Sequence, residues 1–224
     1  MRPGGACCFG ARIGAVIGGL VRGLGGGAMT MAAMLALASA ARAENSVLDL
    51  IPPNITYGEV KFGVLDHDSH FLGGKEGGFD VNPELILPSP VPDWWANSLP
   101  PYLRWTVQPR PTIGGQKNIG GFTDQFYLGP TWSWQLARDV VNPGDGVTWS
   151  VFFGPGFNNG DIHATVPDHK SLGAHVLFRV AGELGYQITQ VYQVSAYIDH
   201  ISNGGFARYN QSINDVGARL GIRF

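Results

Sequence analysis

Apolar and polar residues alternate along much of the chain with the two-residue period of β-strands. Between Val191 and Ser202, apolar side chains take most of the even positions and polar ones most of the odd positions. In the last stretch, Asp215 and Arg219 oppose an apolar set in the same way. Clusters of Gly, Pro, Asn and Asp separate eight stretches with strand character. These are Ile55–Asp66, Gly78–Leu87, Tyr102–Pro109, Gly121–Leu136, Val147–Phe157, Leu172–Ile188, Val191–Ser202 and Ile213–Phe224.

The lengths of these stretches and the end of the chain favour a membrane barrel. Several stretches exceed the five or six residues usual in soluble sheets and suit strands tilted across a bilayer. A soluble β-sandwich would also alternate, so alternation alone leaves both folds open. The chain ends on Phe224, with Ile222 and Leu220 on the same face, which resembles the terminal signature that the barrel assembly machinery reads. The sequence therefore predicts an all-β fold, an eight-stranded antiparallel transmembrane β-barrel.

Residues 1–43 predict a signal peptide. Arg2 and Arg12 give a positive start, apolar stretches follow, and Ala41-Arg42-Ala43 has the small-x-small form of a cleavage site. A retained membrane helix is the alternative, but no uninterrupted run reaches the roughly 20 apolar residues that a helical span needs. Residues 44–224 are then a single barrel domain, and the expected location is the outer membrane of a Gram-negative bacterium.

Composition narrows the class of function. The chain has 33 Gly and 15 Pro but only 14% charged residues, which argues against a helical bundle. Its formal net charge of −2 provides no basic field for nucleic acid. Both cysteines, Cys7 and Cys8, lie at the extreme N-terminus, so the rest of the chain has neither a disulfide nor a thiolate metal site.

One connection is long for its predicted place. With both termini on the periplasmic side, the connections after the first, third, fifth and seventh strands face outward, and the others should be short turns. Pro88–Pro101, with Trp94 and Trp95, is long for such a turn. Either the strand boundaries differ there, or the two tryptophans lie at the membrane interface.

Two residues near the end of the seventh stretch suggest ester chemistry. His200 and Ser202 stand two apart, so their side chains leave the strand on the same face. An imidazole within reach of a hydroxyl can take its proton as the oxygen attacks an ester carbonyl. The pair continues the parity of Val194 and Ile198, the predicted lipid face, where polar groups are costly and indicate function. At the outward end of a strand, they would meet acyl esters of the outer leaflet.

The remaining histidines predict no metal site. His67 and His70 lie near Asp66 and Asp68, but a solvated loop is the expected setting for all four.

Several motifs together indicate a family. The chain resembles the lipid A 3-O-deacylase family, which is acyloxyacyl hydrolase-like. The stretches that carry this resemblance are His200-Ile-Ser-Asn-Gly-Gly205, Asn210, Asn214, the closing Gly217–Phe224, the opening Gly58–Gly63 and Leu177–Tyr186.

The resemblance implies an eight-stranded barrel that hydrolyses the ester-linked 3-hydroxyacyl chain of lipid A with no metal or other cofactor. By position in the motif, His200 is the general base and Ser202 the nucleophile. The side-chain amide of Asn203 and the backbone N–H of Gly205 match the donors that stabilise the oxyanion. The glutamate that holds the histidine in the family is here Asn214 by register. An amide can orient the ring but lacks the charge that steadies an imidazolium, so weakened activity is expected.

The predicted partners are lipid A or lipopolysaccharide, the surrounding outer-membrane lipids and the barrel assembly machinery, while a homodimer stays open. Two alternatives to a lipid A deacylase remain. One is a structural or adhesion barrel that lost catalysis, which Asn214 favours. The other is a periplasmic lipid carrier with a closed cup.

Overall fold

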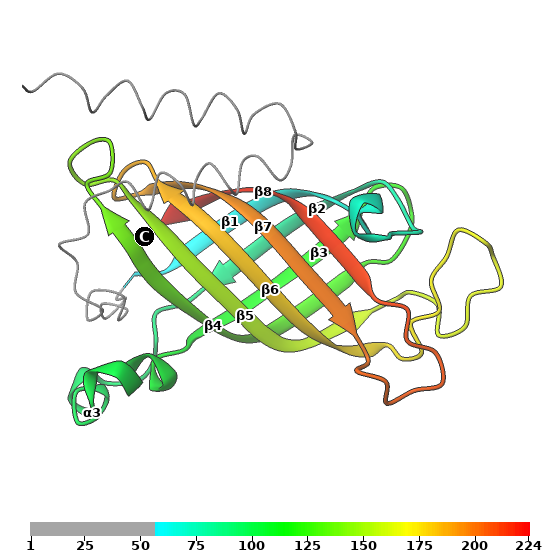
Figure 1. The fold of residues 1–224 in the computed structure, drawn as a ribbon, viewed down its shortest axis with the longest axis horizontal. Helices are drawn as coiled ribbons and strands as arrows, with labels where there is room; N and C mark the ends of the chain where they lie inside the picture. Colours follow the sequence, from blue (N-terminus) through cyan, green and yellow to red (C-terminus); the bar gives the residue numbers. More distant parts are fainter. Residues whose placement is uncertain (1–56) are drawn as a thin grey trace, which may run out of the picture. The chain divides into compact units, whose positions relative to one another are not determined.

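The computed structural model describes residues 57–224, which form one closed barrel of eight antiparallel strands (Figure 1). Each strand pairs with its neighbour in sequence, and β1 pairs with β8 to close the sheet. The predicted fold is confirmed, whereas the predicted signal peptide lies outside the described residues. The strands are β1 Glu59–Asp66, β2 Phe79–Ile86, β3 Arg110–Asn118, β4 Gln125–Arg138, β5 Gly146–Asn158, β6 Val176–Gln187, β7 Tyr192–Ser202 and β8 Ile213–Arg223.

The third strand lies further along the chain than predicted. Residues 102–109 fall largely within the 3-10 helix η3, Pro101–Val107, and β3 follows it. Proline is favoured at the start of a helix because its φ is preset and it needs no N–H partner there. The glycines of β3 hide its strand character, but Gly114 is needed because a Cβ there would come within 2.5 Å of the Tyr127 ring. The prediction for this strand was therefore wrong.

The two ends of the barrel differ. One end, called the loop end below, carries the connections after β1, β3, β5 and β7, including the 3-10 helix η2, His70–Leu72. The other, the turn end, carries the β4–β5 and β6–β7 turns, the C-terminus and the connection that holds η3 and the short helix α3, Asp93–Ala96 (Figure 1). Across residues 57–224, no helix combines the length and apolarity required to cross a membrane.

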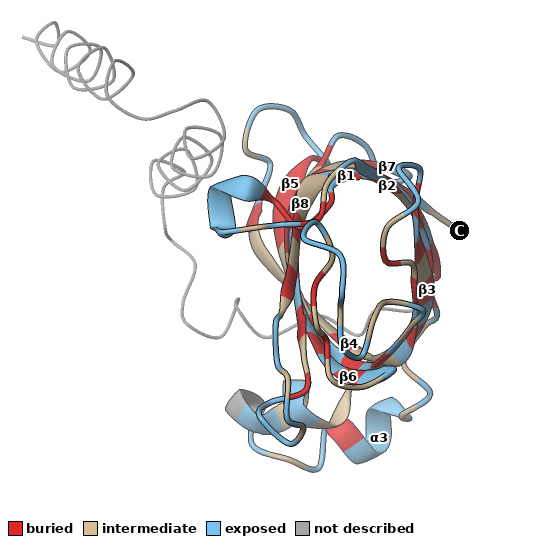
Figure 2. Cartoon of the chain, turned by 90° about the vertical axis from the view of Figure 1, so that its right-hand side faces the viewer, coloured by how far each residue is buried: buried red, intermediate tan, exposed pale blue. Residues whose placement is uncertain are grey.

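Charged side chains fill the lumen. Arg219 donates to Glu183 at 3.1 Å and also to Glu84, and Lys61 donates to Glu183 at 2.7 Å. Arg179 donates to Asp199 at 2.7 Å, and all these groups are buried. Figure 2, which looks from the loop end, shows the buried residues spaced along the ring of strands. A buried charge is costly unless it is paired, and each of these charges has an opposite partner inside the barrel.

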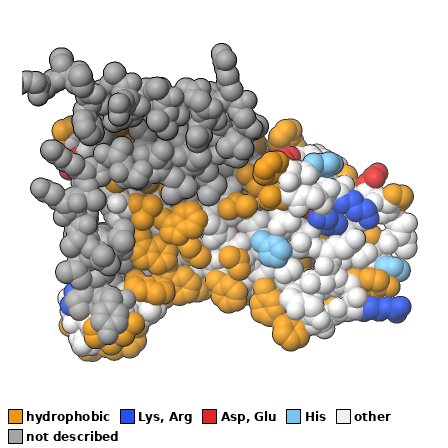
Figure 3. Space-filling view, viewed as in Figure 1, with side chains coloured by type: hydrophobic (Ala, Val, Ile, Leu, Met, Phe, Trp, Pro, Cys, Tyr) orange, Lys and Arg blue, Asp and Glu red, His pale blue; other side chains and the backbone are white. Residues whose placement is uncertain are grey.

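The outer surface is apolar. Phe62, Val64, Phe126 and Leu220 point outward and are 57%, 59%, 46% and 63% exposed. Figure 3 shows hydrophobic side chains over the barrel surface, whereas Lys, Arg and His side chains gather at the loop end. An apolar exterior around a charged interior is the arrangement of a transmembrane barrel.

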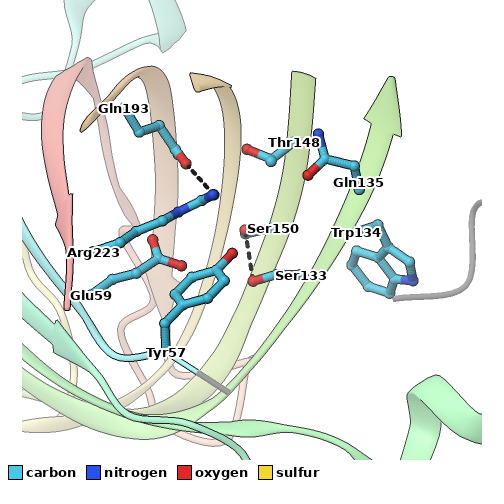
Figure 4. Close-up of a pocket in the computed structure, with 9 residues that line it drawn as sticks. All are labelled: Tyr57, Glu59, Ser133, Trp134, Gln135, Thr148, Ser150, Gln193 and Arg223. Carbon is cyan, nitrogen blue, oxygen red and sulfur yellow. Dashed lines mark hydrogen bonds between the residues drawn. The ribbon is translucent and has the colours of Figure 1, made fainter. Parts of the chain in front are cut away.

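A small cavity at the turn end, lined mostly by polar residues, shows this separation of polar interior and apolar exterior along one strand. Ser133 and Gln135 of β4 turn toward the lumen, together with Glu59 and Arg223 (Figure 4). Trp134, between those two β4 residues, points out of the barrel. Alternate residues of a strand leave opposite faces, so Trp134 belongs to the outer surface.

Candidate active site

His200 and Ser202 lie at the loop end of β7 with their side chains outside the barrel. The Oγ of Ser202 is 3.1 Å from Nε2 of His200, a hydrogen-bond distance. His200 is exposed and Ser202 half-buried, while their neighbours Asp199 and Ile201 are buried inside. The two groups therefore share a proton path on the surface that faces lipid.

Asn214 completes a line of three side chains. Strand β8 pairs with β7 so that Asn214 stands directly opposite His200. Its Oδ1 is 2.7 Å from Nδ1 of the imidazole. A carbonyl oxygen can only accept, so Nδ1 carries the proton and donates it to Asn214. The lone pair of Nε2 is then directed at Ser202, which is the tautomer that a general base needs.

The backbone of Asn214 is itself held in place. Its carbonyl oxygen accepts the N–H of Ser69, in the β1–β2 loop, at 2.7 Å. The loop end thus fixes the strand position from which the amide reaches the imidazole.

The turn after Ser202 uses the predicted oxyanion donors for its own structure. Asn203 is buried, and its Nδ2 donates to the carbonyl oxygens of Leu172, at 2.8 Å, and of Tyr209. Its Oδ1 accepts the N–H of Gly205 at 2.9 Å. Gly204 has a φ of 65° and Gly205 one of 83°, a region that favours glycine. Both predicted donors are therefore engaged, and their role toward an oxyanion stays a prediction.

One backbone donor of this turn has no partner. The N–H of Asn203 donates to Oδ1 of Asn210, at 3.0 Å, and that of Gly205 to Asn203. Within residues 57–224, the N–H of Gly204 meets no acceptor. This group was not singled out from the sequence, because its freedom depends on how the turn folds.

An apolar groove of about 420 Å³ lies on the outer surface beside the pair. Phe178 lines it and stands opposite Ser202 in the strand register. The ring of Phe206 lies 6.0 Å from that of Phe178. The groove is also lined by Phe153, Pro155, Ala174, Val176 and Ala207. The groove could not be predicted from the sequence, because its residues come from β5, β6 and two separate loops.

His67 differs from its predicted setting. It is fully buried at the loop end rather than solvated. Its Nδ1 lies 2.9 Å from Asp80, and its Nε2 lies 3.1 Å from Glu76. Burial alone would lower the pKa of His67, but these hydrogen bonds and the nearby Asp215 raise it to about 10. The imidazolium bridges carboxylates of β2, β8 and the first loop, so this cluster is an ion network of the barrel mouth.

Comparisons with known proteins identify the family of this barrel. A closed eight-stranded barrel with an apolar exterior and a charged interior belongs to the class of outer-membrane β-barrels. A sequence model described as lipid A 3-O-deacylase (PagL) matches residues 102–223, more than half of the chain. The chain belongs to this family, and it is an outer-membrane β-barrel of Gram-negative type.

A solved outer-membrane enzyme shares the fold. The crystal structure of the outer membrane enzyme PagL has 16% sequence identity and a TM-score of 0.54, and the match covers 73% of this chain and 98% of that one. The N-terminal β-barrel domain of Pseudomonas aeruginosa OprF has 8% identity and a TM-score of 0.44, with 75% and 98% covered. Among curated proteins, no sequence matches the chain.

Proposed function

We propose that this protein is a serine esterase that hydrolyses the 3-O-linked 3-hydroxyacyl chain of lipid A in the outer leaflet. The observation that carries the proposal is the hydrogen-bonded line Ser202–His200–Asn214 on the lipid-facing surface. Family membership supports lipid A as the substrate class. The groove beside Ser202 gives an apolar chain a place to lie while its ester reaches the hydroxyl.

The proposed reaction has two halves. Nε2 of His200 takes the proton of Ser202 as Oγ forms a bond to the acyl carbonyl carbon. The tetrahedral oxyanion then collapses, and the imidazolium gives its proton to the departing sugar oxygen. In the second half, His200 deprotonates a water that attacks the acyl-serine. The bond between Oγ and the acyl carbon then breaks, the imidazolium returns the proton to Oγ, and the hydroxy fatty acid leaves.

Two groups assist these steps. The Oδ1 of Asn214 accepts a hydrogen bond from Nδ1–H and orients the ring, although it supplies no charge to the imidazolium. The oxyanion is met at the turn after Ser202, where Asn203 and Gly205 are our proposed donors. They exchange their present bonds within the turn for bonds to substrate, while the Gly204 N–H is already available.

Lipid A profiling tests the proposal. Ser202→Ala and His200→Ala are expected to abolish the loss of one 3-hydroxyacyl chain in mass spectra of lipid A from expressing cells. Ser195→Ala, on the same strand but inside the barrel, is the matched control and should keep the activity. Each variant must show the heat-modifiable migration of a folded barrel. Identical lipid A from wild type and Ser202→Ala cells would overturn the proposal.

A catalytically inactive structural barrel is the second candidate, and the amide at position 214 favours it. In that case neither the wild type nor a variant with a carboxylate at 214 alters lipid A.

A further inference from the structure

The connection between β2 and β3 leaves tryptophans uncovered on the outside of the barrel. Trp94 is 76% exposed, Trp95 46%, and Leu103 40%. Large apolar side chains clustered at such exposure need a partner. We call residues 92–107, which hold α3 and η3, the foot.

The foot lies beside the barrel and not beneath its opening. Both Figure 1 and Figure 2 place α3 outside the ring of strands, and Figure 1 places it at the turn end. The ring of Trp105, in η3, lies 5.7 Å from the ring of Trp134. Trp134 points out of β4 (Figure 4), so the foot contacts the surface that faces lipid. It must therefore share the depth of the membrane with that surface.

The contact continues an aromatic band. Trp149 of β5 stands opposite Trp134 in the strand register. Trp134 and Trp149 lie near the turn end of their strands, which is where tryptophan gathers in membrane barrels. The foot extends this band outward with Trp94 and Trp95.

The charge of the foot fits a lipid boundary. Asp93 and Arg104 are its charged residues, and they cancel. An indole has an apolar body and one N–H donor, so it is favoured where acyl chains meet headgroups. A neutral segment rich in tryptophan suits this boundary, whereas a segment that relied on anionic headgroups would need lysine or arginine.

We propose that the foot is an interfacial anchor that inserts Trp94, Trp95 and Leu103 into the headgroup–acyl boundary of the phospholipid leaflet at the turn end. This leaflet is the periplasmic one if the loop end faces outward. The anchor holds the barrel at a fixed depth and tilt, and so keeps Ser202 level with the opposite leaflet.

A label at position 94 tests the anchor. Trp94→Cys is made with Cys7 and Cys8 replaced by serine, and the cysteine carries an environment-sensitive fluorophore. Because Trp94 is exposed, the substitution spares the barrel, whose folding is checked by heat-modifiable migration. Pro143→Cys, in the exposed β4–β5 turn at the same end, is the matched control. The protein is reconstituted in phosphatidylethanolamine–phosphatidylglycerol vesicles, with spin-labelled lipids that quench near the headgroup or near the chain end.

The anchor predicts a blue-shifted emission at 94 relative to 143, and quenching that is stronger near the headgroup than near the chain end. Emission at 94 equal to that at 143, with no quenching, would place the foot in water and overturn the proposal. A third outcome is a blue shift that the lipid quenchers leave unchanged and that decreases as the protein is diluted in lipid. It would show that a second copy of the protein covers the foot, which would also overturn the proposal. None of these readouts depends on deacylation, so they stand apart from the test of the proposed function.

Discussion

At the scale of single residues, the chemistry of the site depends on what Asn214 offers to His200. The 2.7 Å contact fixes the tautomer and the ring orientation. When the imidazole becomes charged, however, a carboxylate would be attracted to it and an amide is not. In serine proteases, loss of the carboxylate costs about four orders of magnitude in kcat. Here the correct tautomer is already held, so the missing part is the charge alone.

Asn214→Asp is therefore expected to raise kcat, because the two side chains have the same length and differ in charge. The gain should stay below about 10⁴-fold, the full cost seen when a triad loses its carboxylate. Release of hydroxy fatty acid from purified lipid A measures the gain. Asn214→Leu, which cannot accept a hydrogen bond from Nδ1–H, should fall below wild type. An unchanged rate in Asn214→Asp would mean that the amide suffices.

Part of this site could be predicted from the sequence. The two-residue spacing put His200 and Ser202 on one face, and the resemblance to the deacylase family put Asn214 beside the histidine. The engagement of Asn203 could not be predicted, because its acceptor Leu172 comes from a different loop. Burial of His67 could not be predicted either, because its ring lies among Glu76, Asp80 and Asp215, which come together only in the folded barrel.

At the scale of elements, the third strand shows how local composition misleads. Residues 102–107 are rich in aromatic and β-branched types, which indicate a strand, but two prolines before them start a 3-10 helix. The true strand, β3, contains Pro111, two glycines and several polar residues. The inward face of β3 lies against the polar lumen, and Gly114 packs against the ring of Tyr127. The residue types of β3 are therefore determined by contacts with other strands.

Closure of the barrel requires a residue without a side chain at Gly217. A Cβ at this position of β8 would lie 2.2 Å from the backbone oxygen of Val64 in β1. A backbone atom cannot move aside as the end of a flexible side chain can. We therefore expect Gly217→Ala to destabilise the pairing of β1 with β8 by about 1–3 kcal/mol. The temperature at which the heat-modifiable band converts should fall. Gly221→Ala on the same strand, where the nearest atom is 3.5 Å away, should convert close to the wild-type temperature.

The loops at the barrel mouth should be most firmly held in mildly acidic solution. Burial by itself would raise the pKa of Glu76, but His67 and three backbone or side-chain donors lower it from 4.5 to about 2. The pKa of His67 rises from 6.5 to about 10, so its contribution is complete below 6.5 and is lost as the pH climbs through 10. The contribution of Glu76 is complete above 4.5 and is lost as the pH falls through 2. Both contributions are complete together between 4.5 and 6.5.

Protease cleavage in the loop that holds Lys170, whose backbone N–H donates to Glu76, reports this network. With a protease active across the range, cleavage is expected to increase as the pH rises from 6.5 toward 10. Glu76→Gln should raise cleavage at all these values, since one partner of the imidazolium loses its charge. Asp161→Asn, which removes a half-exposed partner of His169, should change it little. A cleavage rate that is flat with pH in the wild type would contradict the network.

At the scale of the whole molecule, the position of the site and the two kinds of barrel end define one orientation. The proposed chemistry needs Ser202 in the leaflet that holds lipid A, and Ser202 lies at the loop end. The short β4–β5 and β6–β7 turns lie at the other end, as is usual on the periplasmic side. The foot shares that end, so its proposed anchoring requires the same orientation.

Cysteine accessibility on intact cells tests this orientation. With Cys7 and Cys8 replaced by serine, Asp168→Cys places an exposed thiol in the β5–β6 loop, and Pro143→Cys places one in the β4–β5 turn. A thiol reagent too large to cross the outer membrane should label position 168 in whole cells, and position 143 only after the membrane is broken. Both sites should label equally in detergent, which controls for reactivity. Labelling at 143 in whole cells with none at 168 would show the opposite orientation. Ser202 would then lie in the leaflet without lipid A and could not reach the proposed ester.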